Sequence, residues 1–321
     1  MGKGKRYLRE VRNLLNSDQI LQLMIAGITV GSIYALIALG FVVIHNVTGV
    51  INFAQGEFAM LGALIAVTLS QDTSLLNRSV AVGLNWPLPV AILAATLLVA
   101  AIGMALYRFA IRPARTRSVI VQIIITIGAA IALRGAALIV WSTDPYRLPN
   151  FTEGAPMHIG QAVITQQDLW MIGTALVLLL LLYLFFQRTL LGKALRACAI
   201  NRTAAYLMGI NVNTMTFLAF ALSAGIGALA GIVITPKTFM SYDTGAFLGL
   251  KGFVAAAAGG LKDETSAVVG GLALGLLETL AAGYLSSGYK DAIAFIALFI
   301  ILFFQASGIW RRSGSQETAG V

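Results

Sequence analysis

Long apolar runs follow one another along most of the chain, and the charged residues lie mainly in the short segments between them. A helix needs about 20 apolar residues to cross the hydrocarbon core of a bilayer, which is roughly 30 Å thick. The runs of suitable length are 20–44, 87–107, 119–141, 169–186, 215–235, 266–285 and 292–310. The pattern therefore predicts an all-α integral membrane protein that crosses the bilayer many times.

Two further apolar stretches are too short or too interrupted to be ordinary spans. Residues 58–69 would form only about 18 Å of helix at roughly 1.5 Å per residue, less than the thickness of the core. We expect this segment either to enter the bilayer and turn back or to continue a broken helix. Residues 244–260 are rich in Gly and Ala and contain Lys251, and a discontinuous helix inside the bundle would suit them.

The basic residues between the runs decide the predicted orientation, because cytoplasmic loops carry an excess of Lys and Arg. Two short loops are basic without any acidic residue, whereas the segment 142–168 between them is mainly acidic. The basic positions are Arg108, Arg112, Arg115 and Arg117 in one loop and Arg188, Lys193, Arg196 and Arg202 in the other. We expect both loops to be cytoplasmic, together with a basic N-terminus at 1–19 and a C-terminal tail at 311–321. The transmembrane domain would then occupy 20–310 with about eight full crossings, with 58–69 re-entrant and 244–260 crossing.

The composition supports a membrane protein and argues against other classes. Apolar residues make up 58% of the 321 residues and charged residues 11%, and the charged share is well below the roughly one quarter usual in soluble domains. The net charge of +9 would suit nucleic acid. The basic residues lie in interhelical clusters, however, and positive-inside topology explains them better. We therefore expect a lipid-embedded chain with no nucleic-acid partner.

The sequence lacks motifs for catalysis or metal binding. Cys198 is the only cysteine, His45 and His158 are the only histidines, and no cluster has the spacing of metal ligands. The phosphate-binding motif G-x-x-x-x-G-K-[ST] is absent too, since Lys193 is followed by Ala194. We predict that the chain is not an enzyme, holds no metal, and needs a separate chain for any ATP hydrolysis.

Small residues spaced by four mark helix faces that can pack closely in a membrane. The pairs are Gly27 and Gly31, Gly227 and Gly231, and Gly271 and Gly275. We expect them to serve helix packing. A repeat of two halves cannot be established, because runs rich in Gly and Ala resemble one another by composition alone.

The basic segment 187–212 contains a short predicted helix. Asn201 is suited to cap its first turn, and Gly209 is suited to the left-handed conformation that ends a helix. Such an alanine-bearing helix, held between two spanning helices, would fit a groove on a peripheral motor subunit. From these residues alone, a surface helix that binds lipid headgroups is an equally good interpretation.

Asn52, Gln55 and Glu57 interrupt an otherwise apolar region. Polar groups at membrane depth are costly and usually face protein or a water-filled path, so these three residues are candidates for a translocation path. A structural turn, in which Asn52 and Glu57 cap the helix that follows, is a compatible alternative.

Arg134 and Glu278 are ionisable residues well inside apolar runs. Because burying either charge alone is costly, we expect an ion pair between them, or with groups at the lipid edge, rather than contact with a substrate. Lys251 is expected to extend its amine toward the interface.

Several motifs, taken in order, resemble a known family. The segments Gly31-Ser-Ile-Tyr-Ala-Leu-Ile-Ala-Leu-Gly40 and Val50-Ile-Asn-Phe-Ala-Gln-Gly-Glu-Phe58 resemble the signature of the branched-chain amino acid ABC transporter permeases of Liv type. The resemblance is to the smaller of the two paired permeases. It continues through 196–199, 207–211, 220–231, 251–260 and 270–278, and so covers most of the chain.

This resemblance implies an ABC importer permease that translocates branched-chain (hydrophobic) amino acids across the inner (plasma) membrane of a prokaryote. It implies a second homologous permease, two cytoplasmic ATPase subunits that bind ATP and Mg²⁺, and an extracytoplasmic solute-binding protein, while the chain itself holds no cofactor. The segment 187–212 would then dock on an ATPase. Its candidate coupling residues are Arg196, Asn201, Arg202, Ala205 and Gly209.

Two departures from the family pattern bear on the substrate and on the partner ATPase. The chain has His45-Asn46 where many members have Tyr-Gly or Tyr-Lys, and Asn201-Arg202 where an acidic residue is usual. Urea permeases share much of the second motif, so urea or a short amide is the alternative substrate. An ATP-independent channel or carrier, and a structural membrane scaffold, are alternatives from other classes.

Overall fold

The computed structural model describes residues 17–71, 84–114, 118–160, 162–261 and 263–284, together with isolated positions between 288 and 303. The helices are α2 (Ser17–Thr48), α3 (Gln55–Ser70), α4 (Leu88–Leu106), α5 (Arg112–Ala114), α6 (Val119–Trp141), α7 (Gln166–Arg188), α8 (Leu190–Ile200), α9 (Arg202–Leu207), α10 (Val212–Ile234), α11 (Thr244–Ala258) and α12 (Glu264–Tyr284). A π-helical segment, η2 (Tyr107–Ile111), joins α4 to α5. The strands β1 (Met157–Ile159) and β2 (Ala162–Ile164) form an antiparallel hairpin.

Within the described part of the chain, six helices are long and apolar enough to cross a membrane: α2, α4 with its continuation through α5, α6, α7, α10 and α12. The helices α3 and α11 are apolar but shorter. The predicted helical membrane fold is thus confirmed, whereas the count of about eight full crossings is not. The predicted span at 292–310 lies almost entirely outside the described residues.

Side-chain caps explain where two of the long helices begin. Ser118 accepts a hydrogen bond from the backbone N–H of Val121 at the start of α6. Thr165 and Asp168 form a reciprocal capping box at the start of α7. These caps satisfy backbone N–H groups that have no partner within the helix, so each helix can begin directly after a loop.

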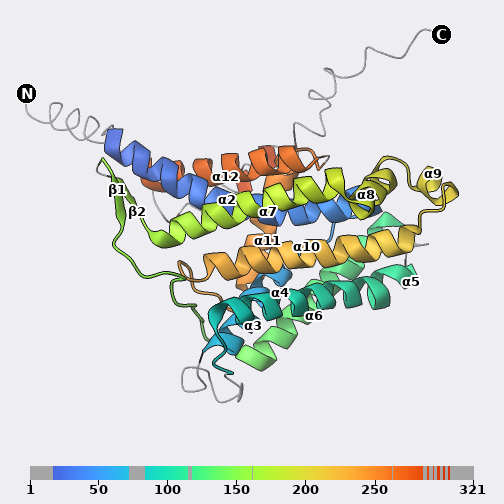
Figure 1. The fold of residues 1–321 in the computed structure, drawn as a ribbon, viewed down its shortest axis with the longest axis horizontal. Helices are drawn as coiled ribbons and strands as arrows, with labels where there is room; N and C mark the ends of the chain where they lie inside the picture. The colour runs from blue at the N-terminus through green and yellow to red at the C-terminus, as the bar shows by residue number, and fades with distance from the viewer. Residues whose placement is uncertain are drawn as a thin grey trace, which may run out of the picture.

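The helices lie side by side, with α2 and α12 along one edge of the view in Figure 1, α4 and α6 along the opposite edge, and α10 and α11 between them. Residues 31–44 of α2 are buried along their whole length, as is nearly all of α3. Many long side chains of α4, α6 and α7 are exposed. These outer helices therefore present apolar faces to lipid or to another subunit, while α2, α3 and α10 form the interior.

Glycines bring α2 and α12 into backbone contact. A Cβ atom on Gly31 would lie 2.9 Å from Cα of Leu272, and a Cβ atom on Gly275 would overlap the backbone of Gly31. Such small faces let helices approach where lipid removes the hydrophobic driving force. The predicted packing role of the glycine pairs is confirmed here, and the pair on α10 packs against α3 in the same manner.

The bundle has two distinct ends. The hairpin end contains β1 and β2, and the arginine end contains α5, α8 and α9 (Figure 1). Gln22, near the start of α2, is joined to Val163 of β2 by two hydrogen bonds: Gln22 Nε2 donates at 3.2 Å and Gln22 Oε1 accepts at 2.7 Å. The helix α2 therefore begins at the hairpin end. In 17–19, the part of the predicted N-terminal segment 1–19 that the structure describes, the chain therefore lies at the opposite end of the bundle from the basic loops.

The path of α3 explains this reversal. Trp141 Nε1 donates a 2.8 Å hydrogen bond to Oγ1 of Thr68, and Gln71 Nε2 donates a 2.6 Å hydrogen bond to the carbonyl oxygen of Arg147. Both contacts lie at the hairpin end, so α3 runs on to that end and does not turn back within 55–70, as the broken-helix alternative for 58–69 requires. Together with the non-helical segment 49–54, α3 forms a broken passage through the bundle. Because this passage lies between α2 and the first basic loop, α2 starts at the end of the bundle opposite to that loop.

Candidate functional site

Two short helices, α3 and α11, begin next to each other inside the bundle. A Cβ atom on Gly56 would overlap the carbonyl oxygen of Gly245, and a Cβ atom on Gly245 would lie 3.0 Å from the carbonyl oxygen of Gly56. Gly249, one turn further along α11, also approaches the backbone of Gly56. The positively polarised N-termini of both helices therefore meet. We call this place, formed by 55–57 and 244–249, the junction.

The two segments that lead into the junction run in opposite directions. The helix α2 goes from the hairpin end to the arginine end, and α3 returns to the hairpin end. The helix α10 starts at the arginine end and is followed by Met240, which pairs with Tyr146 at the hairpin end. Then α11 returns to the arginine end, where Gly259 packs against Ser266 of α12. Many transporters consist of inverted halves whose broken helices begin near the membrane midplane and line the substrate site, and the junction has this form.

Two of the three polar candidates before α3 have structural partners. Asn52 is fully buried, and its Oδ1 accepts a hydrogen bond from the backbone N–H of Ala54 at 3.2 Å. Gln55 Nε2 donates to the carbonyl oxygen of Ser223 at 3.0 Å, and Ser223 Oγ donates to Gln55 Oε1 at 2.5 Å and contacts the carbonyl oxygen of Gly40 at 2.8 Å. Gln55 thus ties α2, α3 and α10 together. Asn52 closes a turn just before α3, whose N-cap residue Ala54 makes no side-chain cap hydrogen bond, so the capping alternative does not hold for Asn52. Gln55 is a packing residue in this conformation.

The third candidate, Glu57, forms an ion pair with Arg134 of α6, with 2.6 Å between Glu57 Oε1 and Arg134 Nη2. The Glu57 side chain is 1% exposed and the Arg134 side chain 34%. Within the described residues, Glu57 Oε2, Arg134 Nε and Asn52 Nδ2 are buried without a hydrogen-bond partner. The expected pair between Arg134 and Glu278 is therefore wrong, and Glu57 does not cap α3. The pair instead places a partly accessible charge beside the junction.

Glu278 has a different partner. Lys251 Nζ of α11 lies 2.8 Å from Glu278 Oε1 of α12, and it also lies 5.6 Å from the ring centre of Tyr34 on α2. The side chain of Lys251 is 13% exposed and that of Glu278 is completely buried. The expectation that Lys251 extends toward the interface is wrong, because its charge is neutralised inside the bundle. This second ion pair ties α11 to α12.

An aromatic cluster lies on the arginine-end side of the first ion pair. The ring centres of Phe53 and Phe253 are 5.6 Å apart, and those of Phe41 and Phe253 are 5.8 Å apart. The backbone N–H of Phe53 donates a 3.2 Å hydrogen bond to Oγ1 of Thr126. Thr126 precedes Arg134 on α6 by eight residues, or about 12 Å of helix. The charged and the aromatic groups therefore follow one another along the bundle.

The second candidate region is the segment α8–α9 at the arginine end. Asn201 Oδ1 accepts a 2.9 Å hydrogen bond from the backbone N–H of Ala204. Gly209 has φ of 84°, its N–H donates to Tyr206 O at 3.0 Å, and the N–H of Ile210 donates to Ala205 O at 3.0 Å. These paired bonds form a Schellman motif. The predicted cap and terminating glycine are both confirmed, so α9 is a fixed element.

Large apolar side chains are exposed in and around α9, beside the exposed Arg202 and Thr203. Ile200, Tyr206, Leu207 and Met208 are 83%, 70%, 78% and 82% exposed. Ala205, predicted as a coupling contact, is buried and supports the helix from within. Sequence reasoning missed the four exposed apolar side chains because it considered only the caps and the alanines. Their sequence signal is three consecutive apolar residues just before the terminating glycine of a very short helix.

The remaining coupling candidates lie around α9. Arg202 and Gly209 are exposed, whereas Arg196 is partly buried and lines a cavity of about 390 Å³ together with Asn46 and Glu264. Cys198 is buried on α8, and this burial raises the pKa of its thiol. The thiol is therefore less ionised than an exposed cysteine would be, as expected for an unreactive residue.

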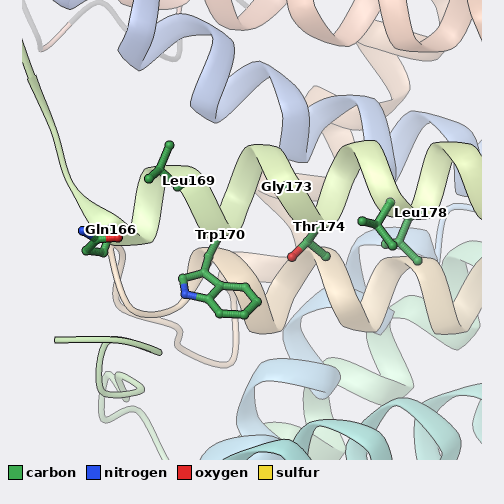
Figure 2. A pocket seen from close by; sticks show the side chains of 7 residues that line it. Gln166, Leu169, Trp170, Gly173, Thr174 and Leu178 are labelled. Atoms are coloured by element: carbon green, nitrogen blue, oxygen red, sulfur yellow. The ribbon is translucent and has the colours of Figure 1, made fainter. Parts of the chain in front are cut away.

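The outer face of α7 carries a groove of about 460 Å³ at the hairpin end. Figure 2 shows Trp170 projecting beside Thr174 and Leu178, with Gly173 on the same stretch of helix. The lining is almost entirely apolar, and Trp170 Nε1 is bonded to Oγ1 of Thr152 at 3.1 Å. The groove therefore provides apolar surface for a lipid chain or a neighbouring helix rather than a polar recognition site.

In the residues that the structure describes, no group of three or more His, Cys, Asp or Glu side chains could hold a metal ion. The chemistry available at the junction consists of charge pairing, helix dipoles and aromatic surface. Such groups can bind and release a small polar molecule, and they supply no nucleophile with a general base.

Comparison with known proteins agrees with this chemistry. The family described as branched-chain amino acid transport system, permease component, matches residues 23–302. The high-affinity branched-chain amino acid transport system permease protein LivH of Salmonella typhimurium is 31% identical over 91% of this chain and 96% of its own length. The corresponding BraD of Pseudomonas aeruginosa is 34% identical over the same shares. A probable LivH of Methanocaldococcus jannaschii is 27% identical over 88% of this chain and 90% of its own length.

Proposed function

This chain belongs to the family of branched-chain amino acid transport permeases, and from that membership we propose that it is the transmembrane subunit of an ABC importer for branched-chain amino acids. The observation that carries the proposal is the identity of 31% and 34% to two such permeases over 91% of the chain. The matched region includes both helices of the junction. The chain is accordingly a multi-pass inner membrane protein.

The junction is the proposed place of passage. Two inverted segments meet there through glycines, and a ligand site between such halves can be opened alternately toward each end by small movements of one half. The arginine end faces the cytoplasm in this proposal, because its two basic loops follow the positive-inside rule. The hairpin end then receives substrate from a solute-binding protein. With this orientation the broken crossing of α3 and the crossing of α11 complete the path of the chain.

The segment 187–212 is the proposed contact with an ATPase subunit. An exposed apolar surface on a short, doubly capped helix suits a groove on a partner, because capping fixes the helix while its apolar side chains remain uncovered. The importer would contain a second homologous permease and two ATPase subunits, and ATP and Mg²⁺ would bind to those ATPases. This chain supplies the path and the mechanical contact.

Uptake of labelled leucine in cells lacking this chain, and in cells with the chain restored, tests the proposal. We expect restoration to give ATP-dependent leucine uptake that isoleucine and valine suppress and urea does not. A chain carrying Leu207→Asp is the matched control, since it should reach the membrane and fail to transport. Uptake of urea alone would show that the substrate is wrong, and leucine uptake without ATP would show that the importer mechanism is wrong.

A further inference from the structure

We propose that the ion pair of Glu57 and Arg134 is the substrate site itself, and that it binds the zwitterionic backbone of an amino acid. The carboxylate of the substrate would pair with Arg134 and its ammonium group with Glu57, so that one internal ion pair is replaced by two pairs to the ligand. This inference rests on the proposed transport function and adds the contacts that recognise the substrate.

The ion pair of Glu57 and Arg134 lies at the junction. Glu57 is in the first turn of α3, and its Oε2 lies 2.5 Å from the place of a Cβ atom on Gly245, in the first turn of α11. The pair therefore lies at the two helix N-termini that form the junction. Asp243, just before α11, is close enough to act electrostatically on Glu57. A ligand that enters between α6 and the junction would meet both signs of charge.

The ion pair also leaves part of its hydrogen-bonding capacity unused. Only one oxygen of Glu57 and one nitrogen of Arg134 contribute to the 2.6 Å contact. Oε2 of Glu57 and Nε of Arg134 have no hydrogen-bond partner among the described residues, and neither does Nδ2 of Asn52, five residues before Glu57 in the sequence. Buried polar atoms in folded proteins are nearly always satisfied. A ligand with a carboxylate and an ammonium group would supply the missing acceptor and donor.

Electrostatics then selects the class of ligand. Opening a buried ion pair leaves two unpaired charges in a medium of low dielectric constant, which is strongly unfavourable. A zwitterion neutralises both charges at once. A simple anion or cation neutralises one and strands the other, and urea neutralises neither. The pair therefore favours amino acids over urea and over singly charged analogues.

The second intramembrane ion pair, Lys251 and Glu278, is more deeply buried than the pair of Glu57 and Arg134. In the pair of Lys251 and Glu278 the carboxylate is completely buried and the lysine is 13% exposed, whereas Arg134 is 34% exposed. Lys251 is also covered by Tyr34. The pair of Lys251 and Glu278 is thus a closed structural contact, and it provides a matched control of the same chemistry in the same bundle.

The test must separate this site from the solute-binding protein, which has its own specificity. The complete importer is reconstituted in vesicles with the binding protein outside, and ATP together with a test compound is enclosed inside. Compounds on the inside reach the permease and never meet the binding protein. The compounds are leucine, leucinamide as the cation, 4-methylpentanoate as the anion, and urea, and the readout is inhibition of leucine uptake from the opposite side.

We expect internal leucine to inhibit uptake at concentrations roughly tenfold or more below those of the other three compounds, a ratio that corresponds to about 1.4 kcal/mol. The double variant Glu57→Gln/Arg134→Gln, which keeps size and hydrogen bonding, should lose this discrimination and most of its maximal uptake rate. The double variant Lys251→Gln/Glu278→Gln should keep both.

Equal inhibition by all four compounds in the unchanged importer would overturn the proposal. So would unchanged discrimination in the Glu57→Gln/Arg134→Gln variant. Failure of the proposed function gives a different result, because the unchanged importer would then show no ATP-dependent leucine uptake at all. Size-exclusion chromatography of the assembled complex confirms that each variant is folded before transport is measured.

Discussion

The junction and the segment α8–α9 are built in opposite ways. At the junction the backbones touch through glycines, the polar groups are buried, and the helices begin without a side-chain cap hydrogen bond. At α9 the helix is capped at both ends and its large apolar side chains are exposed. The junction is specified by contacts inside this chain, whereas α9 leaves large apolar side chains uncovered, which suits the proposed contact with an ATPase subunit.

The largest combined effect on folding and uptake is expected from adding side-chain volume where the backbones of α3 and α11 meet. Gly56→Val would push two methyl groups into the backbone of α11. Neither helix can move without displacing its neighbours, so overpacking here should cost ~3 kcal/mol, the upper part of the usual range. We expect loss of folded protein and of uptake, measured by fluorescence-detected size-exclusion chromatography and leucine transport. Gly128→Val is the control, because a Cβ atom on Gly128 meets nothing within 4 Å. Equal amounts of folded protein and equal uptake for the two variants would show that the backbones of α3 and α11 do not meet at Gly56.

At α9 the expected effect is on coupling and leaves the fold of the permease intact. Met208→Asp places a charge on the apolar surface that would be buried against an ATPase. We expect uptake to fall by roughly tenfold or more, since a lost contact of about 1.4 kcal/mol has this effect on binding. Co-purification of the ATPase should fall with it, while the melting temperature of the permease stays the same. Leu190→Asp, at an 85% exposed position on α8, should have little effect, and an equal loss there would show that α9 has no special role.

The contributions of the two intramembrane ion pairs to stability can be compared by removing the cation of each. Lys251→Gln leaves Glu278 buried with its charge uncompensated by lysine, and breaking such a pair costs about 3–5 kcal/mol. Arg134→Gln leaves Glu57, whose side chain is 1% exposed, without its cation in the same way, so we expect a loss of similar size. Melting of the purified permease at one pH measures both losses. A loss near zero for either variant would show that its ion pair does not stabilise the fold.

The smallest expected effect concerns the cap of α9. Asn201→Ala removes the acceptor of the Ala204 N–H, which costs about 1 kcal/mol of local helix stability. We expect faster hydrogen exchange in 202–207, a several-fold lower uptake rate and an unchanged melting temperature. Asn201→Asp keeps an acceptor at the N-cap and should behave like the unchanged chain. Unaltered exchange in the alanine variant would mean that partners, and not the cap, hold α9 in shape.

The sequence predicted most helices because period and length are local properties of the chain. The spans at 119–141 and 215–235, for example, correspond to α6 and α10, and the caps at Asn201 and Gly209 were predictable from residue type. Which charges pair could not be predicted, since Glu57 meets Arg134 and Lys251 meets Glu278 only through the packing of α3 on α6 and of α11 on α12. The direction of α2 was missed for a related reason. Counting charges in loops cannot detect a crossing that is partly non-helical.

The glycine contact between α2 and α12 has a consequence for temperature. Soluble proteins owe much of their stability to the burial of apolar surface away from water. Exposing this surface to water gives their unfolding a large positive heat-capacity change. When α2 and α12 separate within a bilayer, their surfaces meet lipid chains instead of water, so the contact relies on close van der Waals packing. Separating these two helices should therefore involve only a small heat-capacity change. Their association should weaken almost linearly on warming, without the curved dependence and the low-temperature weakening typical of soluble domains.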